Sequence, residues 1–358
     1  MTIQKYVVSR DDAIYEAWPD VALAPSGKLV CVFSECTHHS DRSYTRIMLA
    51  TSTDEGKTWS PKRPLTDPLK GDPKTDPFWN CPRISALPDG RLAAVVDRVA
   101  GRKNKIGGKQ ENFLWFSSDE GETWDGPHAT PVYGIVPDQL VDLRQGDHAG
   151  RWILSAHSVL DLPTGLLWSQ RCWLSDDQGQ TWAGPRNIGN VPGLQLCEAT
   201  VAEMPGGALV CFMRENSGQG YDCYRSISRD GGMTWELPQR FPIPGCHRPV
   251  AGMLASGRVL ITHRYMQGGK GWLGWWTQNF FAALTDVESC LAPNRNEAHT
   301  RILPLDYDRS PESDTGYSGW VQLDGGDIYV VNYIVDDAPK AHIRGYRFSE
   351  RDIVLPPD

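Results

Sequence analysis

Charged and hydrogen-bonding side chains stand at the ends of short apolar runs throughout this sequence. The first run of each pair begins near one of Asp20, Arg83, Asp138, Glu198, His247, Arg248 and Tyr317. The second run of most pairs ends near one of Glu35, Arg98, His157, Arg214, His263 and Arg264. Carboxylates and histidines transfer protons, and guanidinium groups bind carboxylate and hydroxyl oxygens. A charged group among apolar neighbours must be paired with an opposite charge or must bind a ligand. The pattern therefore predicts a polar ligand site or a set of ion pairs that seals the interior.

These residues belong to a repeated unit in which two apolar runs flank a turn of Pro, Asp and Gly residues. The six copies cover residues 19–35, 81–98, 137–158, 197–216, 246–264 and 316–333. Alternating apolar positions around a glycine turn are typical of a β-hairpin. The sequence therefore predicts six hairpins that bring their polar ends together.

A second motif, Ser-x-Asp-x-Gly-x-Thr-Trp, lies between the hairpins. It occurs at residues 52–59, 117–124, 175–182 and 228–235. The aspartate can close a turn by accepting backbone hydrogen bonds, the glycine supplies a positive φ, and the tryptophan can pack against a sheet. We therefore interpret the four aspartates as structural.

Each hairpin followed by a third strand, this turn and a fourth strand forms one four-stranded unit. Six such units predict an all-β fold, a six-bladed β-propeller of four-stranded antiparallel blades. We expect a single domain over residues 1–358, closed by pairing residues 3–9 with 341–348. A short helical turn is expected near residues 284–288.

Composition excludes several function classes. The 358 residues carry a net charge of −8 without basic clusters, which makes nucleic acid a poor partner. No apolar run approaches the ~18–20 residues of a membrane span. The nine cysteines are scattered and form no CxxC pair, which predicts buried reduced thiols. No secretory segment is visible, so we expect a cytoplasmic protein, without a metal or another cofactor.

The four turns and six hairpins resemble the sialidase (neuraminidase) superfamily, in which such turns are called Asp-boxes or BNR repeats. The resemblance covers nearly the whole chain. It implies a tyrosine nucleophile activated by a glutamate, an aspartate acid/base and three arginines that bind the sugar carboxylate. Tyr317 in GYS matches the nucleophile, Glu198 in CEATV the glutamate, and Arg214 in FMREN the middle arginine. Asp41 in HHSDRSY is the nearest match to the acid/base.

The resemblance is incomplete at the other two arginines. In register they would fall at residues 17–19 and 276–279, and neither segment contains an arginine. The sugar therefore need not be sialic acid. Further substrate-binding candidates are Arg83, His247, Arg248, Arg264, His157, Asp20 and Trp18, with Trp79, Trp272, Trp275 and Trp320 as aromatic surfaces for a sugar ring.

These matches predict a sialidase-like, exo-acting glycoside hydrolase that removes a terminal sugar from an oligosaccharide or glycoconjugate. A phenol with a pKa near ~10 is a weak nucleophile at neutral pH, so Glu198 would take the proton of Tyr317. Asp41 would protonate the leaving oxygen and then activate water.

Three alternatives stay open. A carbohydrate-binding propeller would keep the arginines and tryptophans without working acid/base geometry. A propeller glycosidase or lyase would use a histidine acid/base, for which His38, His39, His157 and His247 are candidates. A protein-interaction propeller would need a large apolar face and few polar groups in the channel.

Overall fold

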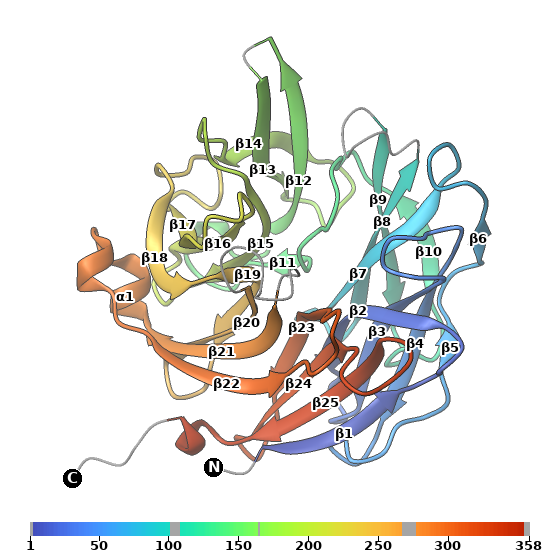
Figure 1. Ribbon diagram of the computed structural model, residues 1–358. Coiled ribbons are helices and arrows are strands. Elements are labelled where there is room, and N and C mark those ends of the chain that lie inside the picture. Colours follow the sequence, from blue (N-terminus) through green and yellow to red (C-terminus); the bar gives the residue numbers. More distant parts are fainter. Residues whose placement is uncertain (1–2, 101–107, 164, 267–276, 354–358) are drawn as a thin grey trace.

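The computed structural model describes residues 3–100, 108–163, 165–266 and 277–353. Its strands form six antiparallel sheets, which confirms the predicted six-bladed β-propeller. Figure 1 shows these sheets arranged in a ring, with their first strands toward the middle. We number the sheets as blades 1 to 6 in chain order.

The blades have the following strands, from the channel outward. Blade 1 contains β2 (Tyr15–Leu23), β3 (Leu29–Cys36), β4 (Tyr44–Ser52), β5 (Arg63–Pro64) and, also against β4, β6 (Leu69–Lys70). Blade 2 contains β7 (Phe78–Ala86), β8 (Leu92–Ala100), β9 (Lys109–Ser117) and β10 (Asp125–Ala129). Blade 3 contains β11 (Val141–Asp142), β12 (Trp152–Leu162), β13 (Gly165–Ser175) and β14 (Ala183–Gly189).

The second half of the ring repeats this order. Blade 4 contains β15 (Leu196–Glu203), β16 (Leu209–Glu215), β17 (Asp222–Ser228) and β18 (Gln239–Pro244). Blade 5 contains β19 (Cys246–Met253), β20 (Arg258–Met266), β21 (Gln278–Asp286) and β22 (Arg301–Tyr307). Blade 6 contains β23 (Thr315–Gln322), β24 (Ile328–Ile334), β25 (His342–Phe348) and β1 (Gln4–Ser9).

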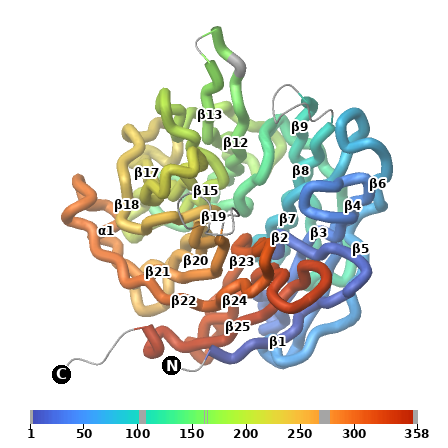
Figure 2. Tube along the Cα trace, viewed as in Figure 1, coloured from blue at the N-terminus to red at the C-terminus, as the bar shows by residue number. Residues whose placement is uncertain are grey.

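Blade 6 joins strands from the two ends of the sequence. Strand β1 pairs antiparallel with β25, so Gln4 lies opposite Arg347. Figure 2 shows this pairing as blue chain beside red chain. This shared sheet ties the first and last strands of the chain together and so closes the ring.

Helices are short in the described part of the chain. They are α1 (Val287–Leu291) and three single 3₁₀ turns, η1 (Gly146–His148), η2 (Arg295–Glu297) and η3 (Glu350–Asp352). Helix α1 begins where Asp286 accepts a hydrogen bond from the Ser289 amide, close to the expected helical turn. None of these helices has the length and apolar character needed to cross a membrane.

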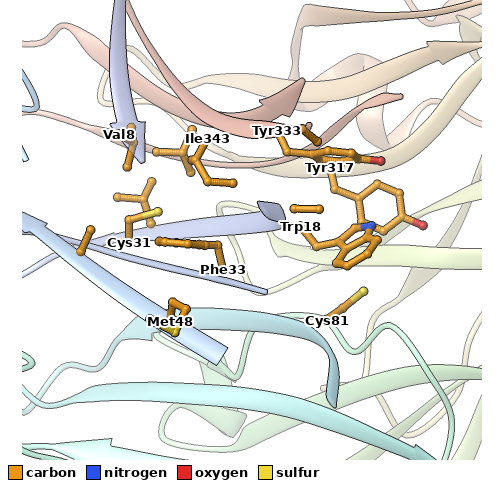
Figure 3. Close-up of a cluster of buried hydrophobic side chains, with 14 of the residues drawn as sticks. Val8, Trp18, Cys31, Phe33, Met48, Cys81, Tyr317, Tyr333 and Ile343 are labelled. Atoms are coloured by element: carbon orange, nitrogen blue, oxygen red, sulfur yellow. The ribbon is translucent and has the colours of Figure 1, made fainter. Parts of the chain in front are cut away.

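Apolar side chains fill the space between neighbouring blades. One cluster joins Cys31 and Phe33 of β3 to Tyr333 of β24, Ile343 of β25 and Val8 of β1. Figure 3 shows this cluster extending from the outer strand toward Trp18 and Tyr317 at the channel. All nine cysteines of the chain are described; they are buried and form no disulfide, as the sequence predicts.

The four Ser-x-Asp-x-Gly-x-Thr-Trp turns have one shared geometry. Asp54 accepts hydrogen bonds from the Thr58 amide at 2.9 Å and hydroxyl at 2.6 Å, and the Trp59 indole donates to the Gly56 carbonyl at 3.2 Å. The other three turns repeat these bonds. Gly56 has a φ of 82°, and a Cβ there would overlap the Tyr329 ring. The aspartate carboxylates therefore accept hydrogen bonds within their own turns, away from the channel.

Candidate active site

A β-bulge near the start of most inner strands directs side chains toward the channel. The register shifts between residues 17 and 20 in β2, 79 and 82 in β7, 197 and 200 in β15, 247 and 250 in β19, and 315 and 318 in β23. Bulges bend a strand and re-aim its side chains. Trp18, Glu198 and Arg248 have positive φ values of 55°, 46° and 51° at these bulges. Non-glycine residues rarely adopt such values without compensating contacts, and they often do so at functional sites.

The bulges surround a cavity of about 410 Å³ at one end of the channel. This volume lies within the range of small-molecule sites. Residues from all six blades line it, and none of the described lining residues belongs to the outermost strand of a blade. The lining residues used below are Trp18, His39, Arg42, Asn80, Cys81, His157, Trp168, Glu198, Arg214, Arg264 and Tyr317.

Tyr317 and Glu198 form the centre of the cavity wall. The Tyr317 hydroxyl interacts with the Glu198 carboxylate and favours its charged form. The Arg214 Nη1 donates to Glu198 Oε2 at 2.5 Å, and it comes from the end of β16 opposite the β15 bulge. The three residues that the sequence identified on three separate segments therefore form one connected group. Tyr317 and Glu198 are buried, with 7% and 8% of their surfaces exposed.

Burial and charge set opposite proton affinities for these two groups. Burial would raise the pKa of Glu198, but Arg214, His157 and the Tyr317 hydroxyl outweigh it and hold that pKa well below the usual range. Burial raises the pKa of Tyr317 well above 10, the Glu198 charge raises it further, and Arg214 and Arg264 oppose the shift. Of the two groups, Tyr317 therefore holds its proton more tightly, and Glu198 is the anion.

Three arginines from three elements line the cavity. Arg214 pairs with Glu198, and the Arg264 guanidinium lies 5.0 Å from the Tyr317 ring centre. Arg42 lies in the loop between β3 and β4, and its guanidinium stacks 3.8 Å from the Trp18 ring centre. Its Nε donates to the His39 carbonyl, whereas its buried Nη1 has no hydrogen-bond partner among the described residues. A buried, unpartnered guanidinium nitrogen on a cavity wall is suited to bind an oxygen ligand.

His157 supports Glu198 from blade 3. Its ring stacks on Trp168 at a centroid distance of 6.0 Å, and its Nδ1 accepts a hydrogen bond from the Glu198 amide at 3.4 Å. Asp97 has a similar role behind the cavity, since it accepts from Asn80 Nδ2 at 2.8 Å and the Cys81 amide at 2.7 Å. These contacts fix the backbone of the bulges that present the cavity residues.

Three of the sequence-predicted binding residues lie beneath the cavity. Asp20 lies 3.3 Å from Arg83 Nε, and Arg83 Nη1 donates to the Ser318 carbonyl at 2.8 Å. Arg248 donates to the Ala199 carbonyl at 2.8 Å. None of Asp20, Arg83 and Arg248 is among the described residues that line the cavity. The contacts of these residues are with the protein, as the ion-pair interpretation of the sequence pattern expects, although Arg83 Nη2 and Arg248 Nε have no hydrogen-bond partner among the described residues.

Other predicted residues also lie outside the cavity. His247 is buried and absent from the described lining, and burial beside Arg214 and Arg264 holds its pKa well below 6.5. Asp41 is also absent from that lining, and its carboxylate accepts from the Ser43 amide at 2.9 Å within its own loop. Trp79 packs against Phe113 and Trp115 between strands.

Trp320 is also absent from the described lining of the cavity. The Trp320 indole donates to the Val250 carbonyl at 3.0 Å, and this side chain lines a different cavity. Trp272 and Trp275 lie outside the described residues. No group of three or more His, Cys, Asp and Glu side chains within the described ranges could hold a metal ion.

Sequence reasoning missed Arg42 and named His39 only as one of four candidates for a histidine acid/base. Both lie in the loop between β3 and β4, where no strand register indicates which side chain turns inward. The only sequence signal was the density of polar groups in HHSDRSY, which pointed to the loop as a whole.

Comparison with known proteins identifies the family of the chain. A family model described as "BNR repeat-like domain" matches residues 27–330. A sialidase of Micromonospora viridifaciens is 25% identical over 239 residues, which is 61% of this chain and 35% of that protein. This chain spans only 16% to 35% of the length of the curated relatives that it matches.

Solved structures show the same architecture. A protein of unknown function from Dyadobacter fermentans has a TM-score of 0.75 at 22% identity, covering 96% of this chain and 98% of that one. The intramolecular trans-sialidase from Ruminococcus gnavus, in complex with oseltamivir carboxylate, has a TM-score of 0.69 at 15% identity, covering 96% of each chain. At these identities the likeness establishes the fold alone.

Proposed function

This chain belongs to the BNR repeat-like domain family of the sialidase superfamily, and on that premise we propose that it is a glycoside hydrolase that removes a terminal acidic sugar. The observation that carries the proposal is the interacting Tyr317–Glu198 pair on a cavity wall that also presents Arg42, Arg214 and Arg264. The match to a sialidase supports a carbohydrate substrate.

The cavity favours the end of a sugar chain. Its volume is about 410 Å³, and the buried layer of Asp20, Arg83 and Arg248 closes the channel beneath it. A site closed on one side accepts a terminal residue and leaves the rest of the chain outside. We therefore infer exo-acting cleavage.

In the proposed reaction the Tyr317 oxygen attacks the anomeric carbon while its proton passes to Glu198. The bond from that carbon to the leaving oxygen breaks, and an acid protonates the oxygen. Water then attacks the anomeric carbon and gives one proton back to that acid, the bond to Tyr317 breaks, and Glu198 returns its proton to the phenolate. The sum is a glycoside and water converted into a free sugar and an alcohol.

An acidic substrate would also prepare the nucleophile. Arg214 is the strongest attraction that keeps Glu198 deprotonated. A substrate carboxylate at Arg214 would compete for that guanidinium and raise the pKa of Glu198 toward its ordinary range. Glu198 would then be a better acceptor for the Tyr317 proton, so substrate binding and activation would be coupled.

The proposal is tested with a panel of 4-methylumbelliferyl glycosides of sialic acid, a uronic acid, rhamnose and a neutral hexose. We expect release of the fluorophore from an acidic member, at least about 10²-fold faster than from the neutral members, because paired guanidinium–carboxylate bonds contribute several kcal/mol. Calorimetric binding of an acidic sugar without turnover would instead establish a carbohydrate-binding propeller.

Arg42→Met is expected to raise KM for the acidic glycoside roughly 10- to 100-fold, since charge-assisted hydrogen bonds contribute about 1.5–3 kcal/mol. Methionine keeps an apolar stem against Trp18 while removing the guanidinium. Steady-state kinetics measure the change, with Arg46→Met as the control because Arg46 donates to the Thr66 carbonyl on the outer side of β4. An unchanged KM would show that Arg42 does not contact the substrate.

A further inference from the structure

A second cavity of about 670 Å³ adjoins the first. Its walls include Tyr15, Gln278, Ser313, Asp314 and Lys340, which come from blades 1, 5 and 6. His39 lines both cavities. A sugar held in the first cavity with its chain continuing into the second would therefore pass this side chain at the linking oxygen.

His39 is held by a buried carboxylate. Its Nδ1 lies in hydrogen-bond contact with Asp314 Oδ2. Asp314 also accepts from the Tyr333 hydroxyl at 2.6 Å and from the Tyr15 hydroxyl, and it lies 3.6 Å from Arg264 Nη2. Burial would raise the pKa of Asp314, but His39, Arg264 and Tyr15 hold it well below the usual range. Asp314 is therefore a fixed anion.

This contact selects the working nitrogen of the ring. With Nδ1 directed to Asp314, Nε2 is the nitrogen left for a ligand, and no hydrogen bond from the described residues engages it. The ring is further fixed by Trp18, which meets it edge to face at 5.3 Å. The side chain is 43% exposed, so a ligand in either cavity can reach it. A carboxylate that orients an imidazole is a recurring arrangement in proton transfer.

Asp41, two residues further on, is placed differently. Its carboxylate caps the loop through the Ser43 amide, and the loop presents His39 and Arg42 to the cavity in its place. Of the two residues, His39 therefore lines the cavity and Asp41 does not.

We propose that His39 is the general acid/base of this hydrolase and that the second cavity receives the leaving group. The proposal rests on the proposed function. As the glycosidic C–O bond breaks, the Nε2 proton passes to the leaving oxygen, and the alcohol departs through the second cavity. Neutral His39 then takes a proton from the attacking water, whose oxygen bonds to the anomeric carbon, and is ready for the next cycle. Asp314 is a positioning residue.

The test compares two glycosides of the same acidic sugar, one with a nitrophenyl and one with an alkyl leaving group. For His39→Ala we expect kcat/KM on the alkyl glycoside to fall 10²- to 10⁴-fold, the range for losing general acid catalysis. On the nitrophenyl glycoside it should change less than about 10-fold, because that leaving group departs without a proton. Azide should accelerate turnover of the nitrophenyl glycoside and yield a glycosyl azide.

Asp314→Asn is expected to show the same dependence on the leaving group, which a merely structural defect would not produce. His128→Ala is the matched control, because His128 pairs with Asp125 at 2.9 Å on the exposed strand β10. It should retain activity on both glycosides.

The outcomes separate this inference from the proposed function. If wild type cleaves both glycosides and His39→Ala loses both equally or neither, the acid/base assignment is wrong while the hydrolase assignment stands. Selective loss of alkyl glycoside cleavage in Asp41→Asn, with His39→Ala active, would return the role to Asp41. If wild type cleaves neither glycoside of any acidic sugar in the panel, the proposed function fails first.

Discussion

Tyr317→Phe is expected to lower kcat for the acidic aryl glycoside on the order of 10³-fold or more, as loss of a covalent nucleophile does in other enzymes. The substitution removes one hydroxyl and keeps the ring, which packs against Tyr333 at 6.2 Å and lies under Arg264. Glu198 keeps its bond to Arg214. The fold should therefore survive, and steady-state kinetics with circular dichroism measure both effects.

Tyr329→Phe is the matched control. Tyr329 is a buried tyrosine of β24 whose hydroxyl donates to the Gly56 carbonyl at 2.8 Å, far from the cavity lining. We expect nearly wild-type kcat from this variant. If Tyr317→Phe keeps more than about a tenth of the wild-type rate, the tyrosine is not the nucleophile.

Asp20→Ala is expected to destabilise the protein by about 3–5 kcal/mol, since it leaves a buried cation without its counter-charge. Asp20 is fully buried and accepts from the Ile84 amide at 2.9 Å and Gln139 Nε2 at 2.9 Å, besides facing Arg83. Burial raises the pKa of Asp20 and lowers that of Arg83, each against the attraction of the partner. Urea denaturation followed by tryptophan fluorescence measures the loss.

Two further variants show whether burial of the charge is the cause. The double variant Asp20→Ala with Arg83→Met should be more stable than Asp20→Ala alone, because no unpaired charge stays inside. Asp89→Ala breaks the exposed Asp89–Arg91 pair and should change stability by less than about 1 kcal/mol. Equal losses in Asp20→Ala and Asp89→Ala would contradict the channel-sealing role.

The sequence predicted the blades because hairpin alternation and the four aspartate turns are local signals. Each turn is closed by bonds within eight residues, such as Asp54 with Thr58. Strand ends also identified Glu198, Arg214 and Tyr317, because inner strands of a propeller converge on one channel.

The same reasoning could not separate the cavity from the layer beneath it. Trp18 and Asp20 are two residues apart on β2, yet Trp18 lines the cavity and Asp20 lies below it. The bulge between them decides which side chain turns outward, and nothing in the apolar alternation encodes a bulge.

The loop between β3 and β4 was unpredictable for another reason. His39 is oriented by Asp314, 275 residues away in the sequence, and Arg42 by its contact with Trp18. Such long-range contacts decide which polar residue of HHSDRSY enters the cavity. Without them, Asp41 was the natural assignment from the family resemblance.

The central claim is that Tyr317 forms a covalent bond to the anomeric carbon. The most direct measurement is intact-protein and peptide mass spectrometry after reaction with a fluorinated glycosyl fluoride of the acidic sugar that the panel identifies. The account predicts a mass gain of one sugar on the peptide that contains Tyr317, absent from Tyr317→Phe. An enzyme that cleaves the matching aryl glycoside, carries no adduct on Tyr317 and releases a product of inverted anomeric configuration would contradict it.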